Sequence, residues 1–588
     1  MSDFICSSDE KSKGELAKHL KGIYSNQAPE VYEYHGPWGS LAVSKNQYNG
    51  FQPLETDSHI IVVIGGPVLN FKSNRFFNGN DPTAGTGEIY RNLMKGVLRW
   101  DEDLSGPFVV LLVDKKRKKF TCITDLMMFI PVYKYIHDDV FMLGTHIDSL
   151  AAAADQLLQY DYASVVDFIL NHAVTYPYTF FRTISQCHPA AVHRFETRVK
   201  AIKETEPKIY WLPVENYNHP NIYQAAYSLR VGLQAYITRV TENMDSVAQF
   251  ISAGEDSRAI AGVLPKQLHR HAFVFLNGMN REGRLAKKAA KAYGLHFHPH
   301  FRGETHYLDI LPEANALIGS GHQYVHAHSL RFHRLCKLDQ YDAVFGGYLS
   351  DSLLKAPYAR KIRGQHLLPW LPHFVIQGET RSKLKNHSIF SSKLLDEIRQ
   401  RRIDHLDRIK RFRAESAHEW FTLWPATMRS TIPNLYCNRR LFRSYEPFMC
   451  NQSVKISASV PTAWKLNRRL FHKTIKPFLA PSKWLASGDG RFPYAAWWLN
   501  FPIQFSYWLT WEVAKRIGLR TYQGPWGDWN LVMKSRQWHE VIKQCRQGFE
   551  PLRKQSNAEN PEDILRGNQL NIEQKINFVQ TLYSLSGR

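Results

Sequence analysis

Two short loops hold the residues of this sequence whose types and spacing best suit chemistry. Residues 252–257 (SAGEDS) follow an apolar run and precede a helical pattern, and residues 346–351 (GGYLSD) follow a second apolar run. At a strand-to-helix turn, backbone N–H groups and the positive helix end bind anions, and small residues allow close approach. Asp256 would repel phosphate unless a cation lay between them, so the first loop predicts a Mg²⁺–phosphate site.

The elements around these loops predict a parallel sheet. Strands are expected over residues 247–251, 271–276, 295–300 and 341–345, with helices over 222–241, 258–264 and 281–293. This alternation is typical of a doubly wound α/β sheet, in which ligands bind beyond the carboxyl ends of the strands. Both loops would then lie at one edge, where Asp256 and Asp351 would hold Mg²⁺. The residues predicted to bind ATP or pyrophosphate are Ser252, Ala253, Gly254, Asp256, Ser257 and Gly347.

The remaining chain divides into a strand-rich start and a helical end. Strands are expected over residues 59–66, 108–114, 120–125 and 140–145, and one helix over 87–104. Residues 156–220, which contain several prolines, are expected to form a connector. After residue 355 the pattern is mostly helical and basic, and residues 397–413 predict a cationic helix.

Several segments resemble the asparagine synthetase family. The two loops resemble its pyrophosphatase-type loop and second magnesium loop, and residues 106–114, 124–135, 280–294 and 445–450 resemble further family segments. The resemblance implies an N-terminal glutaminase domain (1–155) of the N-terminal-nucleophile αββα sandwich fold. After the connector it implies an ATP-pyrophosphatase domain (221–500) and a helical extension (501–588). Such a protein adenylates a carboxylate with ATP, and an amine then attacks.

Three departures from the family concern its two sites. The glutaminase nucleophile is a Cys directly after Met1, but Ser2 stands here, and Gly65-Gly66 replaces the family's Asn-Gly oxyanion pair. We therefore interpret the N-terminal domain as a relic without glutamine hydrolysis, with a Ser2 nucleophile as the open alternative. In the second loop, Leu349 replaces a family Gly, which puts the loop geometry in question.

The resemblance also implies roles near the attacking amine. Tyr348 stands where asparagine synthetases have Glu, as it does in family members that close a β-lactam ring. In those members the Tyr, paired with a Glu, helps to deprotonate the amine; Glu379 is the hypothesised partner here. The family's charge-stabilising lysine falls on or beside Asn467, so Lys465 or Arg468 is expected to substitute, although Arg and Lys are not equivalent.

Composition bounds the partners and the compartment. Lys and Arg total 75 and Asp and Glu 53, a net charge of +22 that favours polyanions such as nucleotides, acidic glycans or anionic lipid. No groove-reading motif accompanies this charge, so nucleic acid is not expected. The seven cysteines include no CxxC pair and the N-terminus has no apolar signal segment, so a cytoplasmic protein is expected.

Residues 494–511 raise the question of membrane contact. They carry no formal charge, yet eight of the 18 residues are aromatic and four others are Asn, Pro, Gln and Ser, which argues against a spanning helix. A buried helix at a domain interface is the favoured interpretation. The alternative is a segment resting on a membrane surface, peripheral to the inner face of a membrane.

The sequence therefore predicts an ATP- and Mg²⁺-dependent amide-forming ligase. Its substrate would be a small-molecule, glycan or peptide carboxylate, adenylated with release of pyrophosphate before ammonia or an amine attacks. Tyr348 and Lys465 or Arg468 would be catalytic. Two alternatives stay open: a catalytically inactive binding protein of this family, and a glutamine-dependent asparagine synthase.

Overall fold

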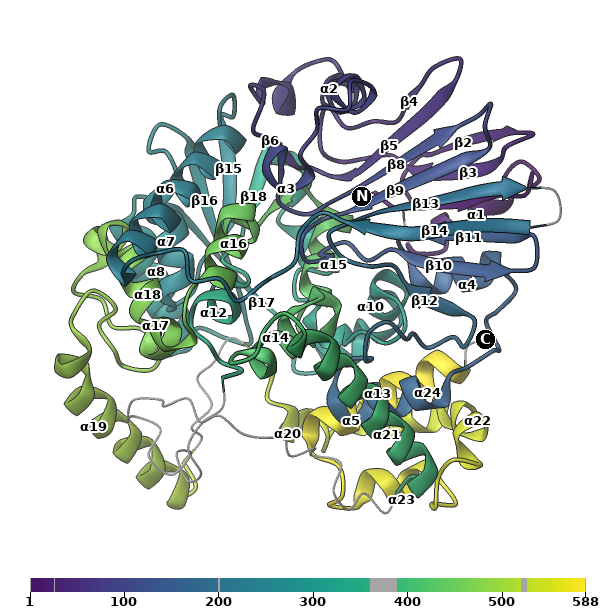
Figure 1. Cartoon of the computed structure of the whole chain (residues 1–588). Helices are drawn as coiled ribbons and strands as arrows, with labels where there is room; N and C mark the ends of the chain where they lie inside the picture. The colour runs from purple at the N-terminus through teal and green to yellow at the C-terminus, as the bar shows by residue number, and fades with distance from the viewer. Residues whose placement is uncertain (1, 26, 199–200, 360–388, 520–525, 587–588) are drawn as a thin grey trace.

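The computed structural model describes residues 2–25, 27–198, 201–359, 389–519 and 526–586, and it confirms the predicted α/β fold (Figure 1). An N-terminal sandwich of two antiparallel sheets is followed by a parallel sheet and a helical region. The first sheet has the order β12 (Ile184–Gln186), β10 (Tyr133–His137), β11 (Val140–Gly144), β1 (Phe4–Ser7), β3 (Gly39–Ser44) and β2 (Val31–Gly36). The second has the order β14 (Ala201–Ile209), β13 (Ala191–Arg198), β9 (Lys119–Thr124), β8 (Phe108–Asp114), β5 (His59–Gly65) and β4 (Leu54–Glu55).

Alternating side chains hold the sandwich together, because successive residues of a strand point to opposite faces. Ile60, Val62 and Ile64 of β5 share the core between the sheets with Phe4 and Cys6 of β1. The intervening residues of β5 face outward, toward α2 (Ala84–Met94). The outer face of the first sheet is covered by α1 (Glu15–Lys21), α4 (Ile147–Ala153) and α5 (Tyr162–Asn171).

The segment 156–220, expected as a connector, contributes three strands to this sandwich. β12 pairs with β10, β13 pairs with β9, and β14 completes the edge beside β13. Ladder pairing joins residues far apart in the chain, such as Phe120 and Phe195. The prolines that suggested a linker lie in its turns and in β14, the edge strand, where a missing N–H is tolerated.

The parallel sheet has the doubly wound order that the sequence predicts. Its strands are β17 (His296–Phe301), β16 (His269–Leu276), β15 (Ser246–Phe250), β18 (Ala343–Phe345) and β19 (Ser444–Tyr445). All neighbours are parallel. The winding direction reverses between β15 and β18, so these two strands form the topological switch point. On one face, Ala272, Val274 and Leu276 pack against the alanines of α8 (Arg281–Ala292).

The single helix expected over residues 87–104 is broken in the structure. α2 ends at Met94, and Gly96 adopts a left-handed φ of 70°. A left-handed glycine commonly ends a helix because it carries no Cβ to clash. The chain then forms the short α3 (Trp100–Asp103) and β7 (Leu104–Ser105), which pairs with β6 (Val68–Leu69). The prediction missed this stop because it followed only the apolar spacing.

Helices make up most of the remaining chain. Between residues 222 and 354, besides α8, they are α6 (Ile222–Val240), α7 (Glu255–Val263), α9 (His306–Asp309), α10 (Leu311–Ile318), α11 (Phe332–Leu335) and α12 (Ser350–Leu354). Those that follow include α13 (Ser392–Lys410), α14 (Ala417–Leu423), α15 (Pro433–Leu441), α16 (Asn451–Ser459), α17 (Thr462–Lys465), α18 (Arg469–Ile475) and α19 (Trp497–Arg516). The last are α20 (Trp529–Val532), α21 (Arg536–Gln544), α22 (Glu550–Arg553), α23 (Pro561–Arg566) and α24 (Ile572–Ser586). α24 returns to the sandwich, where Asn577 donates to the carbonyl of Phe168 on α5 at 3.1 Å.

The aromatic segment 494–511 lies mainly in α19 and is not buried, contrary to the favoured interpretation. Leu499 and Leu509 are 46% and 48% exposed. Figure 1 shows α19 at the periphery, away from the sheets. The sequence could not reveal this, because apolar content alone does not say whether a partner element covers a helix. Among the described helices, none has the length and apolar character needed to cross a membrane.

Candidate functional site

The loop 252–257 joins β15 to α7 and is held in place by its own serines. The hydroxyl of Ser257 accepts from the N–H of Ser252 at 3.0 Å, and the hydroxyl of Ser252 accepts from the N–H of Gly254 at 3.0 Å. The N–H of Ala253 donates to the carboxylate of Glu282 at 2.6 Å. The loop is therefore pre-formed. One of the backbone N–H groups predicted to bind phosphate already donates a hydrogen bond to the Glu282 carboxylate of α8.

The loop 346–351 follows β18, so the two predicted loops lie side by side. A Cβ atom at Gly347 would come within 3.2 Å of the backbone and Cβ of Asp256, so the absence of a side chain there permits this approach. Leu349 adopts a left-handed φ of 70° and is buried. The loop thus keeps a glycine-like conformation without the glycine, at a cost of roughly 1–2 kcal/mol.

Three positively charged side chains lie near Glu255 and Asp256 at this edge. Lys355, at the end of α12, contacts Asp256 and lies 3.4 Å from the carboxylate of Glu255. Arg468 donates to Glu255 at 2.7 Å, and Arg491 lies 3.8 Å from it. Although burial alone would raise it, Lys355 and Arg468 hold the pKa of Glu255 below its usual value.

Asp256 and Asp351, the predicted Mg²⁺ ligands, interact through their charges. Burial raises the pKa of the Asp256 carboxyl; Lys355 opposes this rise, while Glu255 and Asp351 add to it. Asp351 also accepts from the N–H of Ser352 at 2.7 Å. Within the described part of the chain, no group of three or more His, Cys, Asp or Glu side chains is arranged to hold a metal ion. Two carboxylates nevertheless suit Mg²⁺, which usually keeps water and phosphate as its other ligands.

The sequence analysis did not single out Lys355. The lysine that it did single out, Lys465, has a different partner. Lys465 is fully buried and its ammonium lies 2.8 Å from the carboxylate of Glu419, itself 1% exposed. Burial lowers the pKa of Lys465 and Glu419 raises it, with burial prevailing. Lys355 stands four residues after Asp351, one helical turn, and that spacing was the available signal. Of the two expected substitutes, Arg468 lies beside the first loop.

Tyr348 lies next to a buried glutamate that the sequence did not assign. Its backbone N–H donates to the carboxyl of Glu446 at 2.9 Å, and its hydroxyl donates to Thr431 at 2.7 Å. Burial raises the pKa of Glu446 to about 8. Glu446 belongs to segment 445–450, which resembles a segment of the asparagine synthetase family. That resemblance could have pointed to Glu446. The hypothesised partner Glu379 lies outside the described residues.

Arg429 brings a buried positive charge to the same place. Its guanidinium carbon lies 5.5 Å from the ring centre of Tyr348, and one nitrogen donates to Thr431 at 2.8 Å. Its Nε and Nη1 atoms are buried and have no hydrogen-bond partner among the residues that the structure describes. Buried guanidinium N–H groups that lack acceptors are costly, so these two atoms mark a position suited to an anion.

The predicted N-terminal site is closed by hydrogen bonds. Ser2 is 1% exposed, its hydroxyl accepts from the N–H of Gly65 at 3.2 Å, and its carbonyl accepts from Arg439 at 2.7 Å. Next to it, Asp3 is bound by Arg439 and Arg440 at 2.9 and 2.8 Å. Although burial alone would raise it, the two arginines hold the pKa of Asp3 far below its usual range.

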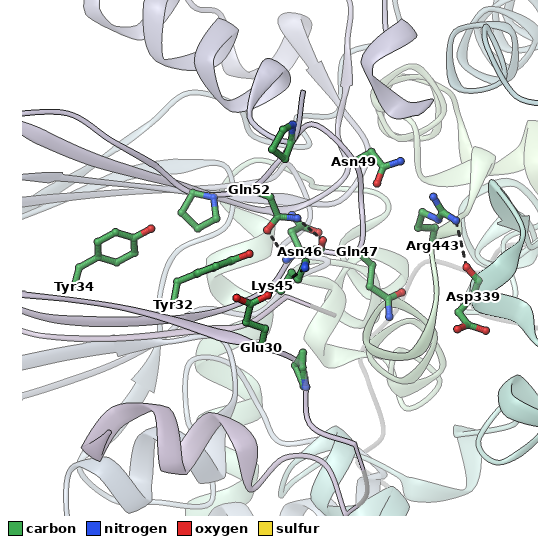
Figure 2. A pocket seen from close by; sticks show the side chains of 13 residues that line it. Glu30, Tyr32, Tyr34, Lys45, Asn46, Gln47, Asn49, Gln52, Asp339 and Arg443 are labelled. Carbon is green, nitrogen blue, oxygen red and sulfur yellow. Dashed lines mark hydrogen bonds and ion pairs between the residues drawn. The ribbon is translucent and has the colours of Figure 1, made fainter. Parts of the chain in front are cut away.

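A cavity of about 750 Å³ lies between the sandwich and the parallel-sheet part (Figure 2). Tyr32 and Lys45 line it from the sandwich, and Arg443 lines it from the loop before β19. Asn46, also in the lining, donates to the carbonyl of Gly65 at 2.9 Å. Gly65 therefore joins the cavity lining to Ser2, because its N–H donates to the Ser2 hydroxyl. The sequence analysis singled out none of the residues that line the cavity.

Comparisons with known proteins bear on the sandwich. Residues 38–211 match the family model of the glutamine amidotransferase domain. The chain carries a glutamine amidotransferase-like domain. This domain includes most of the segment expected to be a connector, in agreement with its strands.

Solved structures and curated proteins add two findings. A glutamine phosphoribosylpyrophosphate amidotransferase from B. subtilis, solved with ADP and GMP, aligns at 9% identity and a TM-score of 0.22. A structure titled as the allosteric regulatory enzyme of purine biosynthesis aligns at 9% identity and 0.24. Each alignment covers 51% of this chain and spans 65% of the other. No curated protein matches the chain.

Proposed function

We propose that the protein is an ATP-dependent amide-forming ligase that adenylates a carboxylate before an amine attacks. The observation that carries this proposal is the meeting of the two loops at the switch point between β15 and β18. Two aspartates, Asp256 and Asp351, and two cations, Lys355 and Arg468, gather at that edge. Ligands of doubly wound sheets bind at such a point.

The residues at this edge suit a magnesium–triphosphate. Asp256 and Asp351 would hold the ion, and the loop serines and remaining amides would bind phosphate oxygens. When bound, Mg²⁺–ATP would supply the adenylyl group and pyrophosphate as the leaving group. Lys355 and Arg468 would offset the phosphate charge, a role that positive groups commonly take in phosphoryl and adenylyl transfer.

The residues beside Tyr348 suit the other two reactants. Arg429, with two unpartnered buried N–H groups, would bind the substrate's carboxylate. Tyr348 would remove a proton from the amine. Burial raises the pKa of Tyr348 above its usual value, so the hydroxyl must give up its own proton as it takes one from the amine. That proton would leave through Thr431, which accepts a hydrogen bond from the Tyr348 hydroxyl at 2.7 Å.

The test is the affinity for Mg²⁺–ATP, measured by titration calorimetry. The unmodified protein should bind, and Asp256→Asn should bind roughly tenfold or more weakly, since it removes a charged ligand while keeping the shape. Asp101→Asn is the matched control, because Asp101 pairs with Lys455 at 2.7 Å, outside both loops. Equal affinity in Asp256→Asn and the control would refute the assignment of this loop.

A catalytically inactive binding protein is the second candidate, favoured by the internal pairing of the loop. Glu282 already takes the N–H of Ala253, and Lys355 already pairs with Asp256. ATP–pyrophosphate exchange, measured over a panel of carboxylates, separates the candidates. Exchange with any carboxylate supports the ligase; nucleotide binding without exchange across the panel supports the binding protein.

A further inference from the structure

The cavity between the sandwich and the parallel sheet has no part in the proposed ligase chemistry. None of its described lining residues belongs to the loops 252–257 and 346–351. Asp339 and Arg443, which line it, lie just before β18 and β19, so the cavity lies near the amino ends of these parallel strands. The two loops follow the carboxyl ends of β15 and β18, at the opposite edge of the sheet. A ligand in the cavity would therefore occupy a second site.

Two tyrosines line the cavity at an edge of the sandwich, on β2, which is an edge strand of the first sheet. Tyr32 and Tyr34 alternate along β2 and therefore share one face. Their partners on β3, Val43 and Leu41, belong to the core between the sheets, and Tyr34 packs against that core. Figure 2 shows both tyrosines at one end of the cavity and Arg443 at the other. Neither tyrosine hydroxyl has a hydrogen-bond partner among the described residues.

Polar side chains supply donors and acceptors to the same cavity. Gln47 is held by its Nε2, which donates to the carbonyl of Leu441 at 3.1 Å, so its amide oxygen stays available. Arg443 is held by Nη2, which donates to the carbonyl of Tyr341 at 2.7 Å. The side chain of Asn49 makes no hydrogen bond within the described chain. An amide offers both donors and an acceptor, as hydroxyl groups of a ligand require.

The charges of the lining cancel. Lys45 and Arg443 are positive, while Glu30 and Asp339 are negative, and the ammonium of Lys45 lies 3.1 Å from the Glu30 carboxylate. Apart from prolines and tyrosines, none of the described lining residues is apolar. A cavity without net charge does not concentrate ions, and one without aliphatic side chains does not suit a lipid chain. The lining suits a neutral ligand that is rich in hydroxyl groups and has one apolar face.

We propose that this cavity binds a neutral saccharide, with Tyr32 against the apolar face of a sugar ring and with Asn49 and Gln47 bonded to its hydroxyls. A tyrosine ring provides a flat apolar body with a polar end, which matches the two sides of a sugar. The volume of about 750 Å³ lies within the range of small-molecule pockets, roughly 300–1,000 Å³, and such pockets are common at domain interfaces. This proposal does not depend on the proposed ligase activity.

Saturation-transfer NMR with the full-length protein tests the proposal. The probes are the neutral trisaccharides maltotriose, cellotriose and triacetylchitotriose, with trigalacturonic acid as the charged comparison. At least one neutral trisaccharide should bind, and NMR titration then gives its Kd. Tyr32→Ala should weaken that binding by about tenfold, because the stacking ring is lost, whereas Tyr32→Phe keeps the ring and should retain most of the affinity. Asn49→Ala should weaken it by about three- to tenfold through lost hydrogen bonds.

The matched control is Tyr227→Ala, which removes a tyrosine that is 63% exposed on α6 and outside the cavity lining. It should bind the trisaccharide as the unmodified protein does. Thermal unfolding without saccharide shows whether each variant folds, and if Tyr32→Ala does not, Asn49→Ala carries the test. The proposal is overturned if no neutral trisaccharide binds, if only trigalacturonic acid binds, or if Tyr227→Ala loses as much affinity as the cavity variants.

Discussion

Replacing Lys355 by Met tests the site most directly, because this lysine links both loops and was not predicted. The substitution removes the ammonium that contacts Asp256 and lies 3.4 Å from Glu255, while keeping an unbranched apolar stem. Glu255 retains Arg468 at 2.7 Å, and the Asp256 side chain is 30% exposed. Glu255 thus keeps a positively charged partner, and Asp256 keeps contact with water. The free energy of unfolding should therefore fall by about 1–3 kcal/mol.

The effect on nucleotide binding should be similar in size to that loss of stability. A hydrogen bond to a charged group contributes about 1.5–3 kcal/mol, so Lys355→Met should weaken Mg²⁺–ATP binding by roughly 10–150-fold. Calorimetry measures the affinity, and thermal unfolding with and without Mg²⁺–ATP measures how far the ligand stabilises each variant.

Lys465→Met is the matched control, because the same change is made at a lysine paired away from the loops. Glu419 would keep the hydroxyl of Thr462, at 2.8 Å, and the charge of Arg413, but would lose its direct ion pair. This variant should lose about 3–5 kcal/mol of stability but little affinity. If it fails to fold, Lys465→Met/Glu419→Leu removes both charges. Unchanged ATP affinity in Lys355→Met, or lost affinity in a folded Lys465 variant, would refute this division of roles.

Three further predictions concern Glu446, Tyr348 and Ser2. Burial raises the pKa of Glu446 from 4.5 to about 8, so the folded state keeps a proton that the unfolded chain loses. The free energy of unfolding should therefore fall by about 1.4 kcal/mol per pH unit as pH rises between those values, and Glu446→Gln should abolish that fall in urea titrations. Tyr348→Phe should leave pyrophosphate exchange intact but slow amide formation by about 10²–10⁴-fold; normal amide formation would remove Tyr348 from the mechanism. Glutamine should not be hydrolysed above background, and glutamate release that disappears in Ser2→Ala would restore a working glutaminase.

The sequence by itself determined the order of elements and the chemistry-bearing loop. Strand, loop and helix follow one another locally around residues 252–257, and local patterns are what apolar periodicity and small residues report. The parallel order also followed, because alternating strands and helices allow few topologies. The second loop could therefore be placed beside the first before any contact was known.

The tertiary structure decided which side chains meet. The sequence singled out Lys465 and not Lys355, and only their contacts with Glu419 and Asp256 show which of the two lies at the loops. Likewise, Glu446 reaches Tyr348 because β19 pairs with β18, a contact between strands about a hundred residues apart in the chain. The exposure of Leu509 on α19 depends on which elements pack around that helix, and the residues of the helix alone do not show this.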